Sequence, residues 1–107
     1  MDHIRIIRNE NIEKVLIGIP KGHKHLRVCV KLKNNSVMIF QEATIANILR
    51  AYVTIGTHPK IKAQELKMHV LGETPQKQGY ALHQLLEIPR NQEEIEEKLR
   101  QFLAKST

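Results

Sequence analysis

Residues 20–41 read PKGHKHLRVCVKLKNNSVMIFQ and carry the clearest structural signal in the chain. Across residues 26–33, aliphatic side chains alternate with mostly basic ones, which is the period of a β-strand with one apolar and one cationic face. Asn34 and Asn35 tolerate a positive φ angle and supply a two-residue turn, and residues 36–40 return as an almost wholly apolar strand. The stretch therefore predicts a β-hairpin.

Two β-branched runs precede this hairpin, at residues 4–7 and 13–19, and each is bounded by polar or turn residues. Short runs of this kind are typical of strands. We therefore expect residues 1–41 to form an antiparallel β-meander of about four strands. Val28 and Val30 lie at the centre of its aliphatic face and are expected in the core.

The second half of the chain, residues 42–107, changes to the 3.6-residue period of helices. A strand is the weaker alternative for the second of these helices, because Ile61, Ala63 and Glu65 do not alternate in polarity. Gly79 weakens the third. The predicted helices cover residues 42–56, 59–71, 74–88 and 91–105.

The predicted fold class is α+β, with the N-terminal meander followed by three to four helices packed on one face of the sheet. We expect a single domain over residues 1–107, with a strand-rich half (1–41) and a helical half (42–107). At 107 residues the chain is long enough for one core, which must be aliphatic because only two Phe, two Tyr and no Trp are present.

The chain is basic, with 17 Lys and Arg against 11 Asp and Glu and a net charge of +6. Eight of these cations and only three of the acids lie in residues 1–41. A basic balance favours anionic partners, nucleic acid first. The single Cys29 indicates a reducing, cytoplasmic setting, and no apolar run is long enough to span a membrane.

The candidate binding site is the set of cations on the open face of the hairpin and in the loop before it. Alternate strand positions lie about 6.6 Å apart, close to the phosphate spacing along one nucleic-acid strand. An ordinary solvated sheet face is the alternative explanation. Gly22 could also let backbone N–H groups approach a small anion. The predicted site residues are Lys21, Lys24, Arg27, Lys31 and Lys33.

Other chemistries have weaker signals. His23 and His25 could share a face, but the other histidines lack ligand-like spacing, so we predict no metal site and no cofactor. Cys29 has cationic neighbours but no partner base, and no catalytic constellation is present. A helix-turn-helix around Gly56 is a second nucleic-acid hypothesis, with exposed residues contacting DNA. Those residues would be Lys60, Lys62, Gln64 and Lys67.

The sequence therefore favours a small basic module that binds RNA or DNA through backbone phosphates. The alternative is a protein-interaction or homo-oligomeric assembly domain without catalytic activity, because the apolar strand at residues 36–40 would attract another chain if it formed a sheet edge. We also expect a homodimer, since the chain holds more aliphatic stripes than one small sheet needs. The two hypotheses differ in partner and share the predicted hairpin.

Overall fold

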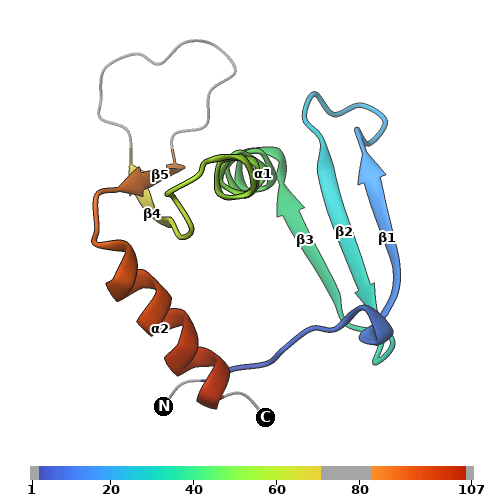
Figure 1. The fold of residues 1–107 in the computed structure, drawn as a ribbon. Helices are drawn as coiled ribbons and strands as arrows, with labels where there is room; N and C mark the ends of the chain where they lie inside the picture. The colour runs from blue at the N-terminus through green and yellow to red at the C-terminus, as the bar shows by residue number, and fades with distance from the viewer. Residues whose placement is uncertain (1–2, 71–82, 106–107) are drawn as a thin grey trace.

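The computed structural model describes residues 3–70 and 83–105 (Figure 1). A 3-10 turn (Asn9–Asn11) leads into three strands, and a helix then connects them to a second pair of strands and a final helix. In chain order the elements are β1 (Ile12–Gly18), β2 (Arg27–Leu32), β3 (Val37–Gln41), α1 (Glu42–Thr57), β4 (Glu65–Val70), β5 (His83–Ile88) and α2 (Gln92–Lys105).

The first three strands form an antiparallel sheet in the order β1-β2-β3. The predicted hairpin is confirmed as β2 and β3, and its turn contains Asn34 and Asn35. Asn35 takes a φ of 72° and donates its N–H to the Leu32 carbonyl oxygen at 3.0 Å, while Ser36 N–H donates to Asn34 Oδ1 at 2.9 Å. An asparagine in the left-handed region allows the chain to reverse here without a glycine.

The last two strands, β4 and β5, form a separate antiparallel sheet. Helix α1 lies between the two sheets, in contact with β2 and β3 on one side and with β5 on the other (Figure 1). Helix α2 follows β5 and carries the C-terminal end of the described chain. The architecture is therefore α+β, with α1 as the link between two small sheets.

The predicted four-stranded meander with three to four helices is wrong. The described residues form two helices and five strands in two sheets. Helices α1 and α2 lie where the sequence predicts them, but residues 4–7 form no strand. Of the helix predicted at residues 59–71, the described residues 59–70 contain no helix and end in β4. The predicted helix at 74–88 is a strand over its last six residues, and residues 74–82 lie outside the described residues.

The missed strand β4 has a simple physical explanation. Leu66, Met68 and Val70 alternate with polar residues, but they occupy even positions, whereas Ile61 and Ala63 occupy odd ones. The apolar residues therefore shift from odd to even positions before β4 begins. An alternating pattern that is extended from Ile61 assigns polar residues to the apolar positions of β4, so the strand is not recognised. Leu66 and Val70 are also four residues apart, a spacing that a helical stripe shares.

The core of the described residues is small. Across residues 3–70 and 83–105, four apolar side chains are buried, namely Val28, Leu32, Ala63 and Ile95. Val28 fulfils the sequence prediction, while Val30 is half-buried. The buried residues come from β2, α2 and the segment before β4, and helix α1 buries none of its own residues.

Candidate interaction surface

The open face of the three-stranded sheet carries apolar residues at its centre. Leu16 of β1 lies opposite Cys29 of β2, which lies opposite Ile39 of β3. Opposite residues in antiparallel strands point to the same side, so these three form one row, here called the apolar band. Leu16 is 60% exposed and Ile39 64%. The face predicted to be cationic is thus hydrophobic at its centre.

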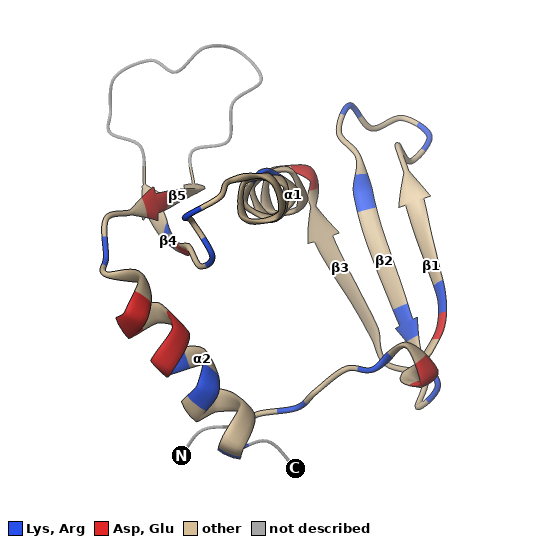
Figure 2. Cartoon of the chain, in the orientation of Figure 1, with Lys and Arg blue, Asp and Glu red and all other residues tan. Residues whose placement is uncertain are grey.

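The cations of β2 lie on either side of this band. Arg27 and Lys31 share the open face with Cys29, but they are four positions apart, or about 13 Å along a strand. Figure 2 shows basic residues toward both ends of β2. The predicted set of cations is therefore divided into two groups, one at each end of the sheet.

Lys31 makes an ion pair across the sheet. Its Nζ lies 3.0 Å from Glu13 Oε2, and Glu13 sits where a bulge interrupts the β1–β2 register. The hydrogen bond and the charge of Lys31 lower the pKa of the Glu13 carboxyl below its ordinary value, and the charge of Lys14 adds to the effect. Part of the positive charge of Lys31 is thus neutralised within the sheet.

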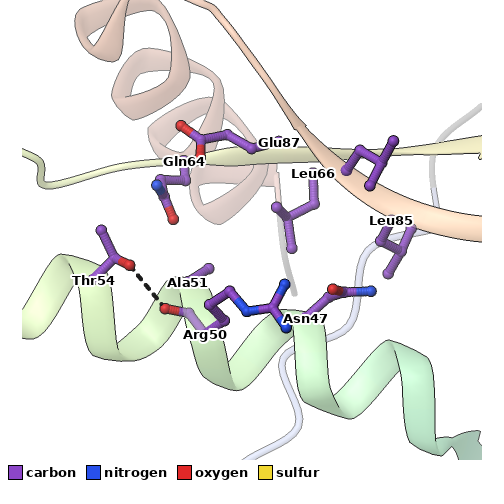
Figure 3. A pocket seen from close by; sticks show the side chains of 9 residues that line it. Asn47, Arg50, Ala51, Thr54, Gln64, Leu66, Leu85 and Glu87 are labelled. Atoms are coloured by element: carbon purple, nitrogen blue, oxygen red, sulfur yellow. Dashed lines mark hydrogen bonds between the residues drawn. The ribbon is translucent and has the colours of Figure 1, made fainter.

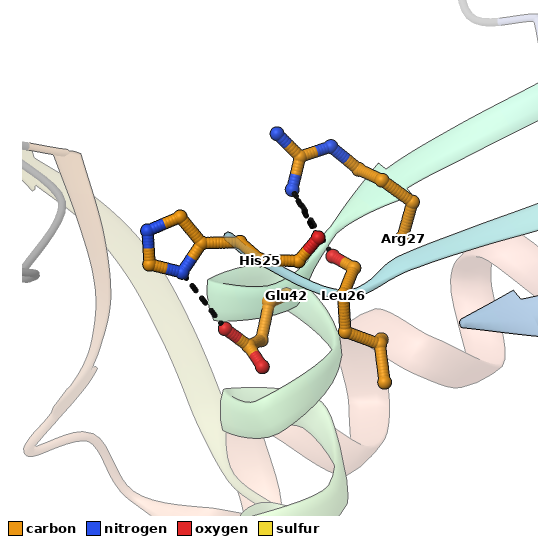
Figure 4. Close-up of polar contacts among 4 residues, drawn as sticks. All are labelled: His25, Leu26, Arg27 and Glu42. Carbon is orange, nitrogen blue, oxygen red and sulfur yellow. Dashed lines mark hydrogen bonds and ion pairs between the residues drawn. The ribbon is translucent and has the colours of Figure 1, made fainter. Parts of the chain in front are cut away.

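Arg27 holds the loop before β2 instead of projecting freely (Figure 4). Its Nη1 donates to the Leu26 carbonyl oxygen at 3.1 Å and to that of His25 at 3.5 Å. His25 Nδ1 lies 3.2 Å from Glu42 Oε2, at the first residue of α1. The His25–Glu42 contact joins the β1–β2 loop to α1, and Arg27 binds the backbone of that loop beside it. Arg27 therefore has a structural role beside the predicted binding role.

The remaining predicted cations are exposed and lie in two different loops. Lys21 and Lys24 belong to the connection between β1 and β2, whereas Lys33 lies in the β2–β3 turn at the other end of the sheet. Gly22 has a φ of 85°, but the adjacent His23 N–H already donates to the Pro20 carbonyl oxygen at 2.9 Å. That N–H is not available to an anion, so the loop offers lysine side chains more than a backbone cradle.

The structure also exposes apolar surfaces that the sequence analysis did not assign to a site. On β1, Val15 and Ile17 lie on the face opposite Leu16, and both are exposed. On α2, Leu99 and Phe102 are exposed beside a groove of about 370 Å³ between this helix and β4. The signal for β1 was present in its sequence, because three consecutive aliphatic residues cannot all point to one side of a strand.

A small cavity of about 150 Å³ lies between α1 and the second sheet (Figure 3). Arg50 and Glu87 line it, and the Thr54 hydroxyl donates to the Arg50 carbonyl oxygen at 3.0 Å. Pockets for drug-sized ligands measure about 300–1,000 Å³. This cavity is too small for such a ligand.

The structure bears on two further hypotheses from the sequence. The helix-turn-helix is wrong, because residues 58–64 form no helix and Lys67 lies in β4. Over residues 3–70 and 83–105, no three His, Cys, Asp or Glu side chains come together in a way that could hold a metal ion. The described residues 58–64 therefore do not provide the recognition helix of the predicted helix-turn-helix.

Comparisons with known proteins supply no family. Searches of protein-family models, of curated proteins and of solved structures each found no match to this chain. Neither α1 nor α2, the helices in the described part of the chain, is long and apolar enough to cross a membrane. Function must therefore be inferred from the surfaces themselves.

Proposed function

We propose that this chain is a homo-oligomeric assembly domain, in which copies of the chain bury one another's exposed apolar surfaces. The distribution of apolar side chains carries the proposal. Within the described ranges four apolar side chains are buried, whereas seventeen large ones are exposed. Single exposed aliphatic residues are normal on monomeric proteins, but contiguous groups of them mark interaction surfaces.

The positions of the exposed residues support the same proposal. On the three-stranded sheet alone, five large aliphatic side chains are exposed, namely Val15, Leu16, Ile17, Val37 and Ile39. Removing apolar surface of this kind from water favours association.

The proposal predicts that mass and stability depend on protein concentration. An oligomer is stabilised by mass action, so its melting temperature rises with concentration, whereas that of a monomer does not. Light scattering should give a dimer or larger species, and circular dichroism melts from micromolar to millimolar protein should shift upward. A monomer mass throughout, with one constant melting temperature, would contradict the assembly function.

A second candidate function is binding to nucleic-acid phosphates, and the β1–β2 loop favours it. Lys21 and Lys24 are both exposed, and no ion pair within the described residues involves either side chain. Arg27, Lys31 and Lys33 complete the predicted contact set. This candidate includes a cytoplasmic location, because the single Cys29 suits a reducing compartment.

Salt dependence tests this second candidate. Each phosphate contact contributes about 0.7 to 0.9 to the slope of log affinity against log salt. The double variant Lys21→Gln, Lys24→Gln should therefore bind RNA or DNA less tightly, with a shallower slope by about two contacts. Lys60→Gln with Lys67→Gln removes the same charge elsewhere and should have little effect. Absence of binding by the unaltered chain at low salt would eliminate this candidate.

A further inference from the structure

We propose that two copies of the chain associate through their β1 strands, which pair antiparallel about a two-fold axis. The pairing would join the two three-stranded sheets into one sheet of six strands. This inference rests on the assembly function proposed above, and it adds the surface, the symmetry and the residue register of the contact.

Strand β1 has the properties of an unprotected edge. It pairs with β2 on one side, and no described element pairs with its other side (Figure 1). An edge strand presents unpaired N–H and C=O groups, which proteins usually protect with lysine, proline or a bulge. In β1 the bulge at Glu13 and the charge of Lys14 protect only the first half. The second half is open to another strand.

The side chains of β1 are exposed on both faces of the sheet. Val15 and Ile17 lie on the inner face of the sheet, which is the face that carries Val28, and they are 45% and 65% exposed. Leu16 is exposed on the open face. A strand from a second copy would cover all three at once. The other edge, β3, exposes Val37 and Ile39 on the open face only, while Met38 and Phe40 on its inner face are half-buried.

Symmetry restricts the register. A two-fold axis perpendicular to the sheet keeps every side chain on its own face, so opposite residues must belong to the same face. Centring the pair on Leu16 sets Leu16 opposite Leu16 of the second copy, Val15 opposite Ile17, and Lys14 opposite Gly18. Centring on Lys14 sets like charges opposite each other, which is unfavourable. Only the Leu16 register matches aliphatic residues on both faces.

This register also extends the apolar band. Leu16, Cys29 and Ile39 of one copy would be continued by Leu16, Cys29 and Ile39 of the other. Neighbouring strands lie about 4.8 Å apart, so the band would span six strands and roughly 24 Å. The cations Arg27 and Lys31 would remain on either side of it in each copy.

Disulfide cross-linking of full-length chains tests the register. In a Cys29→Ser background, Leu16→Cys places two thiols opposite each other, with Cα atoms about 4.5–5.5 Å apart, which suits a disulfide. Lys14→Cys lies on the same face, but the two copies of residue 14 would be roughly 14 Å apart. Mild oxidation of the folded protein should cross-link the Leu16→Cys chain and leave the Lys14→Cys chain largely uncross-linked. Urea should abolish the difference.

A second pair of variants tests the opposite face and remains informative if Leu16→Cys fails to fold. Chains carrying Val15→Cys and Ile17→Cys, mixed in equal amounts in the Cys29→Ser background, should form the mixed disulfide in preference to either symmetric one. A dimer in which residue 14 cross-links as well as residue 16, or in which the mixed disulfide is not preferred, would overturn β1 pairing and leave the assembly function standing. A monomer by light scattering would overturn both proposals.

Discussion

Val28 and Ile17 are opposite residues on the same face of one sheet, yet Val28 is 7% exposed and Ile17 is 65% exposed. The two side chains are similar in chemistry, so the difference comes from their strands. Val28 lies in β2, which has a strand on each side and α1 in contact with it. Ile17 lies in β1, at the edge. An aliphatic residue thus contributes to the core in the central strand and stays exposed in the next one.

This difference has an energetic consequence. Full burial of an aliphatic side chain contributes about 1.5–3 kcal/mol relative to its exposed state. Val28 makes most of that contribution within a single chain, because it is already buried. Ile17 can make its contribution only when something covers β1. Substitutions at the two positions should therefore affect two different equilibria, folding for Val28 and association for Ile17.

The largest effect is expected for Val28→Asp. The substitution places a carboxylate in the core with no cation to pair with it, and burial of an unpaired charge is strongly unfavourable. We expect the free energy of unfolding to fall by more than about 4 kcal/mol, a large share of the 5–15 kcal/mol typical of a domain. Loss of the far-ultraviolet circular dichroism signal at ambient temperature would report it. An unchanged melting temperature would show that β2 does not form the core.

A smaller effect on folding, but a large one on association, is expected for Ile17→Lys. The altered side chain is exposed, so the stability of a single chain should change by less than about 0.5 kcal/mol. A lysine on an edge strand opposes strand pairing, and sedimentation velocity should show dissociation to monomer.

Ile39→Lys is the matched control for this prediction, because Ile39 is similarly exposed but lies on β3. The Ile39→Lys chain should keep the mass of the unaltered protein. Dissociation by Ile39→Lys, with Ile17→Lys remaining associated, would assign the contact to the β3 edge and reverse the comparison between the strands.

Local patterns were sufficient to predict part of the fold. The β2–β3 hairpin follows from the alternation around Val28 together with the turn at Asn35, and α1 and α2 follow from apolar stripes with the helical period. Strand β5 was missed because Leu85 and Leu86 are adjacent, which fits a helix face as well as a strand buried on both sides. Only pairing with β4, a tertiary contact, distinguishes the two.

The candidate surface was less predictable than the fold. The sequence correctly places Arg27 and Lys31 on one face, because they alternate with Val28 and Val30 along β2, as Cys29 does. It did not show which residues of the neighbouring strands join that face, because this depends on register. Leu16 and Ile39 lie on this face because they pair with Cys29. The centre of the face is therefore apolar, and the cations lie toward its two ends.

The smallest effect concerns the ion pair that ties the exposed strand to the central one. Because Lys31, through its hydrogen bond and its charge, lowers the pKa of Glu13, the charged carboxylate is favoured in the folded state. The pair therefore stabilises the fold above the ordinary carboxyl range, and this contribution is lost as the pH falls through the lowered pKa. Glu13→Gln should slightly lower the melting temperature at neutral pH, less so in high salt, and should leave it unchanged in acid.

Glu10→Gln is the control, because Glu10 lies 3.8 Å from Arg8 and does not join two strands. Identical melting curves for Glu13→Gln and the unaltered chain at every pH would show that this contact does not help to hold β1 on β2.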